Sequence, residues 1–86
     1  MSNKAGYHLT EISKGKIGEI SKIQEELDEL KDAALQKSKI MELVELSDLI
    51  GAIELYLEKY HSETTIEDLK IMSDITKRAF INGHRK

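Results

Sequence analysis

The sequence predicts a small all-α domain: an antiparallel helical hairpin plus a third helix, with the bundle completed by oligomerisation. Proline is absent from the 86 residues and 34% of them are charged, a composition that favours helices. Apolar residues recur at intervals of three and four along three stretches, the spacing of a helix with one buried face. Short polar segments separate these stretches. We therefore expect one domain over residues 1–86, with helices at about 16–36, 39–60 and 65–82.

The first helix is expected to follow an irregular lead-in over residues 1–15. Residues 6–15 contain two glycines and show little periodicity, whereas helical spacing begins near Lys16. The polar run 36–39 then interrupts the pattern, and Ser38 is a plausible N-cap for the next helix. The apolar stripe of the first helix consists of Ile20, Ile23, Leu27, Leu30 and Ala34.

The second helix carries apolar residues on more than one side. Its main stripe consists of Leu43, Leu46, Ile50, Ile53 and Leu57. Beyond Asp48 most positions around the helix are apolar, which is typical of a helix buried from several directions. One partner helix and a short third helix cannot cover so much apolar surface, and exposing it is unusual for a monomer. A homo-oligomer, either a dimer or a tetramer, is therefore predicted.

The third helix is bounded by recognisable end signals. Thr65 and Asp68 have the spacing of a capping box, although Glu or Gln is the usual partner. Gly83 is a suitable stop, because glycine adopts the left-handed conformation at little cost. Between these signals lies the apolar set Leu69, Met72, Ile75 and Ala79.

Composition and charge distribution exclude several classes of protein. Cysteine is absent, which excludes disulfides and thiolate metal sites. No apolar stretch approaches the roughly 20 residues that span a bilayer, and residues 1–7 lack the apolar core of a secretory signal, so a soluble cytoplasmic protein without a membrane partner is expected. The net charge of −3 is strongly segregated: residues 25–60 carry four lysines and ten acids, whereas residues 77–86 carry four basic residues and no acid. This pattern argues against duplex nucleic acid as a partner.

Two acidic pairs lie on consecutive predicted helices. Glu26 and Glu29 are three residues apart on the first, as are Glu45 and Asp48 on the second. The second pair interrupts an otherwise apolar stripe, so these carboxylates are expected to be partly buried. Like charges at this spacing repel, and burying them without a partner is energetically unfavourable. A single divalent cation would compensate several of these charges at once. Oxygen-only ligands favour Mg²⁺ or Mn²⁺ over zinc. The alternative is an ordinary solvated acidic face.

These acids also carry a family resemblance. The strings Glu25-Glu26-Leu27-Asp28-Glu29 and Glu45-Leu46-Ser47-Asp48 resemble the E-E-x-x-E and E-x-x-D signature of MazG-like nucleoside triphosphate pyrophosphohydrolases, and residues 40–60 look most like short phage-type members. The resemblance implies Mg²⁺-dependent hydrolysis of a (deoxy)nucleoside triphosphate to the monophosphate and pyrophosphate. It also implies a bacterial host cell, possible phage origin, and self-association. Carried over, the metal ligands are Glu26, Glu29, Glu45 and Asp48, with Glu25 or Glu29 as the general base.

Basic and aromatic residues give weaker signals. The candidates for contact with substrate phosphates are Lys22, Lys77, Arg78 and Arg85. An ordinary Glu–Lys helix pair explains Lys22 equally well, and a solvated, dipole-compatible helix end explains the other three. A flexible lead-in is favoured over a phosphate loop for Lys14-Gly15-Lys16. The histidines share no metal-ligand spacing, and Tyr56 is best explained by packing.

Two other classes of function remain open. A non-catalytic nucleotide-binding or interaction protein could retain the same fold and the same acids. A purely structural oligomerisation module is disfavoured, because it would have no reason to keep five acids without partners.

Overall fold

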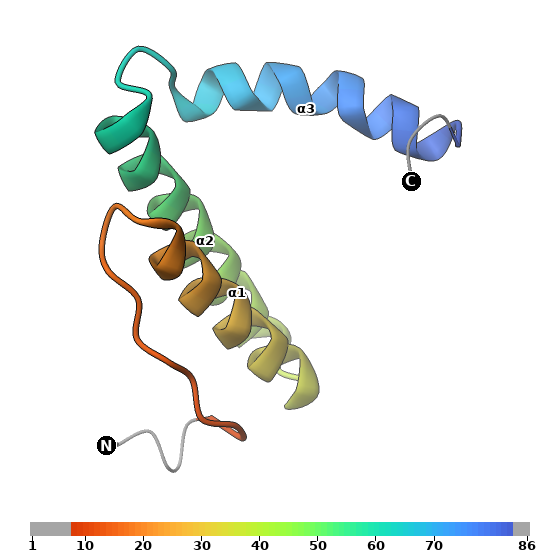
Figure 1. The fold of residues 1–86 in the computed structure, drawn as a ribbon. Helices are drawn as coiled ribbons and strands as arrows, with labels where there is room; N and C mark the ends of the chain where they lie inside the picture. The colour runs from red at the N-terminus through yellow and green to blue at the C-terminus, as the bar shows by residue number, and fades with distance from the viewer. Residues whose placement is uncertain (1–7, 84–86) are drawn as a thin grey trace.

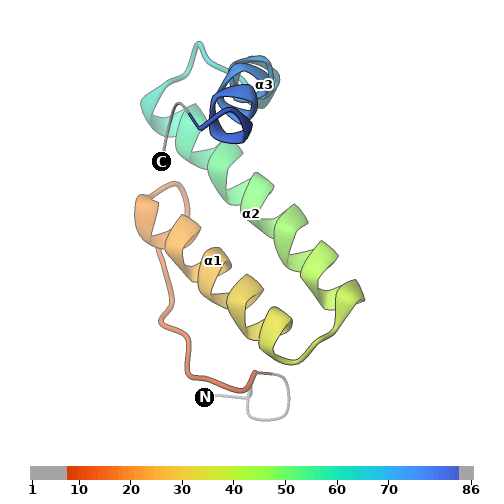
Figure 2. The ribbon, with the colours of Figure 1, turned by 90° about the vertical axis from the view of Figure 1, so that its right-hand side faces the viewer.

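The computed structural model describes residues 8–83 as three helices and no strands, which confirms the all-α prediction. They are α1 (Ile20–Leu35), α2 (Lys39–Tyr60) and α3 (Ile66–Ile81). Helices α1 and α2 lie side by side and antiparallel, and α3 leaves the end of α2 and projects away from this pair (Figures 1 and 2). Across the described part of the chain, α3 contacts α2 but not α1.

The helix ends agree with the predicted signals, except at the start of α1. The Ser38 hydroxyl accepts a hydrogen bond from Met41 N at 3.2 Å and caps α2. Thr65 and Asp68 form a reciprocal capping box at the start of α3, with distances of 3.2 and 2.9 Å. Gly83 has a φ of 77°, as expected for a glycine after a helix.

Helix α1 begins at Ile20, four residues later than predicted. Gly18 has a φ of 85°, a conformation that a helix cannot include, and Glu19 has extended backbone at the N-cap position. The helical spacing that begins near Lys16 therefore includes residues that form a turn before the helix. Helix α2 has the predicted bounds, and α3 is one residue shorter than predicted at each end.

The segment before α1 is irregular, as predicted, and runs alongside that helix (Figures 1 and 2). It is nevertheless held in place. The buried carboxylate of Asp32 accepts hydrogen bonds from Leu9 N and Thr10 N, both at 2.8 Å, and from the Thr10 hydroxyl at 3.0 Å. Further along, Gly15 N donates to Glu25 at 2.8 Å. These bonds fasten the segment to α1, a set of contacts that the expectation of a flexible lead-in did not include.

The core contains few apolar residues and several acids. Ala33, Ala52 and Leu57 are the buried hydrophobic residues of the described range, whereas four acids are buried: Glu25, Glu26, Asp32 and Glu45. Much of the apolar surface is exposed on α2 and α3, and α3 has no buried residue at all. None of the helices within the described range combines the length and the apolar character that crossing a bilayer requires.

Candidate metal centre

Five acids from α1 and α2 gather where the two helices face each other. They form two overlapping groups that share Glu26: one with Glu25 and Glu29, the other with Glu45 and Asp48. Within each group one carboxylate oxygen per residue lies within 4.8 Å of the others. The predicted spacing of three residues on each helix turns both pairs toward the same place, because residues three apart share a helix face. The predicted acids are thus close together, but as two groups and not as one set of four ligands, because Glu29 groups with Glu25 and Glu26.

The second group contains carboxylate oxygens without partners. Glu26 is 6% exposed and Glu45 is 1% exposed, yet Oε1 of each is buried with no hydrogen-bond partner in the described structure. A buried polar atom without a partner is energetically unfavourable, most of all when it carries charge. Asp48 is exposed, so this group is open to solvent on one side. The arrangement can take a hard cation from solvent, with oxygen ligands already converging.

The electrostatics reflect the same crowding. Burial, contact with Glu29, and the charges of Glu29, Asp48 and Glu26 raise the pKa of Glu45 to about 7. Burial and the charge of Glu26 likewise raise the pKa of Glu29. Both shifts disfavour the charged form. At neutral pH without a cation, the cluster therefore retains a proton for part of the time, which a divalent ion would displace.

The first group has cationic partners within the chain. Lys22 Nζ lies 3.1 Å from Glu25 Oε1 and 3.2 Å from Glu26 Oε2, which favours the helix-pair interpretation of Lys22 in this state. Lys14 Nζ lies 3.8 Å from Glu25 Oε2. Although burial opposes ionisation, the bond from Gly15 N and the contact with Lys22 hold the pKa of Glu25 below its ordinary value. Glu25 is therefore a stabilised anion.

The basic residues near the end of the chain do not join this cluster. Lys77 and Arg78 lie on α3, which extends away from α1, and Lys77 Nζ pairs with Asp74 on its own helix at 3.0 Å. Within one chain they are not placed to contact a phosphate at the acidic cluster. Arg85 lies outside the described residues.

Two structural contacts were missed from the sequence. Asp32 is seven residues after Glu25, so a polar face of α1 could have been recognised from this spacing. It holds the lead-in segment, as described above. Glu19 accepts hydrogen bonds from Lys59 and from the Tyr60 hydroxyl, the latter at 2.7 Å, and so joins the start of α1 to the end of α2. No local pattern signals this contact, because its partners are about 40 residues apart.

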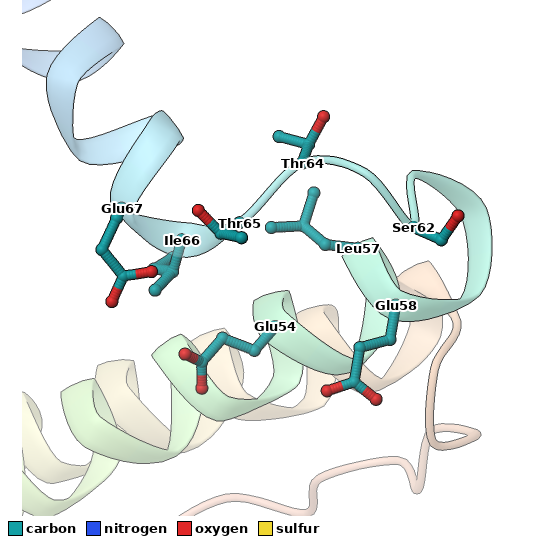
Figure 3. A pocket seen from close by; sticks show the side chains of 8 residues that line it. All are labelled: Glu54, Leu57, Glu58, Ser62, Thr64, Thr65, Ile66 and Glu67. Carbon is teal, nitrogen blue, oxygen red and sulfur yellow. The ribbon is translucent and has the colours of Figure 1, made fainter.

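A separate cavity of about 280 Å³ lies at the corner between α2 and α3 (Figure 3). It is lined by Glu54, Leu57, Glu58, Ser62, Thr64, Thr65, Ile66 and Glu67. Its three acids are exposed, so hydration alone stabilises their charges. None of the three is among the acids with a buried, unpartnered oxygen in the described structure, which lie in the acidic cluster.

Comparisons of the chain with protein-family models, with curated proteins and with solved structures found no match.

Proposed function

We propose that this protein binds a divalent metal ion, Mg²⁺ or Mn²⁺, at Glu26, Glu45 and Asp48, and uses it to hydrolyse a nucleoside triphosphate to the monophosphate and pyrophosphate. The observation that carries the proposal is the pair of buried, unpartnered oxygens of Glu26 and Glu45 beside the exposed carboxylate of Asp48. The donor set fits Mg²⁺, which binds to carboxylates and retains several waters. The choice of reaction rests on the resemblance of the two acidic strings to the MazG-like signature.

The acids divide naturally between two roles. When bound, the metal ion offsets phosphate charge and lowers the pKa of an attacking water. Glu29 is the better candidate for the general base, because its raised pKa brings it closer to neutral pH. Glu25 is less suitable, since Gly15 N and Lys22 stabilise its ionised form. Glu25 then acts by fixing Lys22 at the edge of the cluster.

The proposal is tested by incubating the protein with a panel of ribo- and deoxyribonucleoside triphosphates and Mg²⁺, and by identifying both products. We expect pyrophosphate and a monophosphate, with no turnover after chelation. Glu26→Gln and Asp48→Asn should abolish turnover, because each removes a ligand charge while keeping side-chain volume. Glu58→Gln, an exposed acid of α2, is the matched control and should retain activity. Orthophosphate with a diphosphate, or no turnover across the panel, would refute the proposed reaction.

We also propose that the protein is a homo-oligomer. Helix α3 carries apolar residues that residues 8–83 leave largely exposed: Ile75 is 62% exposed and Phe80 is 55% exposed. The same exposed helix favours the second candidate function, a non-catalytic interaction protein, whose interaction surface would be α3. Metal binding without turnover, together with a stable complex formed through α3, would support that candidate over the enzyme.

A further inference from the structure

The two groups of the acidic cluster differ in whether a lysine of the chain pairs with their carboxylates. Glu26 belongs to both groups, but its two oxygens differ: Oε2 lies 3.2 Å from Lys22 Nζ, whereas Oε1 is buried without a partner. Glu26 thus gives one oxygen to an internal ammonium and keeps the other without a partner, and the residue also groups with Glu45 and Asp48. The two oxygens of one carboxylate are well suited to bridge two cations.

Lys22 occupies the first group in the manner of a bound ion. Its side chain is 24% exposed, and its ammonium contacts both Glu25 and Glu26. Glu25 has a further hydrogen bond from Gly15 N on the same oxygen that faces Lys22, and its other oxygen faces Lys14 at 3.8 Å. Both oxygens of Glu25 therefore already have positively polarised partners.

We propose that each chain takes a single divalent ion, held by Glu26, Glu45 and Asp48, and that the Lys22 ammonium takes the place of a second cation beside Glu25 and Glu26. This inference rests on the proposed metal function and specifies its stoichiometry. Two-metal hydrolases hold their ions about 3.5–4 Å apart over shared carboxylates. A second divalent ion here would have to displace a partly buried lysine whose ammonium makes two charge-assisted contacts.

The proposal also assigns Lys22 a role near the reaction. A fixed ammonium beside the metal site supplies positive charge where a second ion would otherwise stabilise phosphate oxygens. Because Lys22 is bonded to two buried acids, it is a positioning residue for the cluster in the absence of nucleotide. The phosphate role expected of Lys22 and its helix-pair role are then compatible.

The stoichiometry can be measured with Mn²⁺ as a paramagnetic stand-in for Mg²⁺, by isothermal titration and electron paramagnetic resonance at pH 7.5. We expect one Mn²⁺ per chain in the wild type, with no spin-coupled pair. Lys22→Met keeps an unbranched side chain that is one atom shorter and removes its charge, and should raise the count to two ions per chain with a spin-coupled signal. Lys22→Arg retains the charge and should bind one. Lys31→Met, an exposed lysine of the same helix, is the matched control and should also bind one.

The outcomes of this experiment distinguish a failure of the proposed stoichiometry from a failure of the proposed metal binding. Two ions in the wild type would overturn the inference and leave the metal function intact. One ion in a folded Lys22→Met variant would show that Lys22 does not hold the place of a cation. No binding in the wild type would refute the metal function itself, and the inference with it. If Lys22→Met does not fold, as judged by circular dichroism, the wild-type count and the Lys22→Arg count still decide, since a second ion in either contradicts the proposal.

Discussion

Replacing Glu45 with Gln should stabilise the metal-free protein at alkaline pH and remove most of its response to Mg²⁺. Glu45 is 1% exposed, its Oε1 has no partner, and burial together with the neighbouring acids raises its pKa from 4.5 to about 7. Gln keeps the volume of the side chain and removes its charge. Its amide group can also donate a hydrogen bond to an adjacent carboxylate. The substitution therefore relieves the unfavourable interaction without opening a cavity.

The size of the effect follows from linkage between protonation and folding. Below pH 4.5 the folded and unfolded states both hold the proton of Glu45, so the group has no effect on the free energy of unfolding. As the pH rises toward 7 the unfolded state loses the proton first, and stability falls. Above both pKa values the loss levels off at about 3 kcal/mol, because each tenfold change in a proton dissociation constant is worth about 1.4 kcal/mol. Between pH 5.5 and 8 the wild type should lose about 2 kcal/mol, or roughly 10 °C in melting temperature.

Thermal unfolding followed by circular dichroism, at fixed protein concentration with and without chelator, measures these effects. Without metal, Glu45→Gln should melt above the wild type at pH 8, and by a smaller margin at pH 5.5. Mg²⁺ at a hundredfold excess over its dissociation constant should add about 2.7 kcal/mol to the wild type and much less to the variant. Glu58→Gln makes the same charge change at an exposed site of α2 and should behave as the wild type. A metal-free Glu45→Gln variant that is less stable than the wild type at pH 8 would refute the reasoning.

Three further predictions concern the lead-in segment and the assembly. Asp32→Asn should destabilise the protein by about 2 kcal/mol at neutral pH. Hydrogen bonds from Leu9, Gln36 and Thr10 to the Asp32 carboxylate outweigh the effect of burial and lower its pKa to about 2. In the wild type the ionised carboxylate therefore stabilises the fold above pH 4, and this stabilisation is lost as the pH falls through 2. Hydrogen exchange at the Leu9 and Thr10 amides should accelerate in that variant, and unchanged exchange would mean that Asp32 does not hold the segment. Gly15→Ala should lower the denaturant midpoint, because an added Cβ would lie 2.2 Å from the Ser21 carbonyl oxygen; an unchanged midpoint would contradict this close approach. Light scattering at micromolar concentration should give a mass of at least twice the 9.8 kDa of one chain, and a mass near 9.8 kDa would exclude the oligomer.

Local signals in the sequence were sufficient to predict most of the fold. The caps at Ser38 and Thr65 depend on hydrogen bonds within one turn, so residue type and spacing determine them. The start of α1 was placed too early because apolar periodicity continues through Gly18, whose positive φ depends on the turn that it makes. Helix α3 contacts only α2, so its direction depends on the backbone of the loop at 61–65, which apolar periodicity does not specify.

The sequence was sufficient to predict which acids form the candidate site, but not which groups of the chain form hydrogen bonds to them. Spacing alone places Glu26 and Glu29 on one face of α1, and a short connection brings α2 alongside. The fastening of Glu25 by Gly15 N could not be predicted, because it depends on the path of an irregular segment. Spacing could have placed Asp32 on the same face as Glu25, but its hydrogen bonds to Leu9 and Thr10 depend on the path of the same segment. An acid that binds backbone amides and an acid that binds a metal look alike in sequence.

The structure separates these two kinds of acid by what satisfies each one. Asp32 accepts hydrogen bonds from two backbone amides and a hydroxyl, and its pKa falls to about 2. Glu25 has a backbone amide and Lys22, and its pKa also falls. Glu45 is as deeply buried as Asp32, yet its pKa rises to about 7 and one of its oxygens has no partner. The two side chains are equally buried, but Glu45 lacks a donor for Oε1 and also faces the charges of Glu29, Asp48 and Glu26.

This contrast argues that the crowding at Glu45 is not a general consequence of placing acids in a small core. The same chain stabilises Asp32 and Glu25 with its own donors, so donors could also serve Glu26 and Glu45. With only Ala33, Ala52 and Leu57 buried among the hydrophobic residues described, the protein has little apolar stabilisation to offset an unsatisfied charge. This unfavourable arrangement in so small a core, open to solvent at Asp48, is the reason for proposing a cation there. The metal would then contribute to folding as well as to chemistry, and its removal should weaken both together.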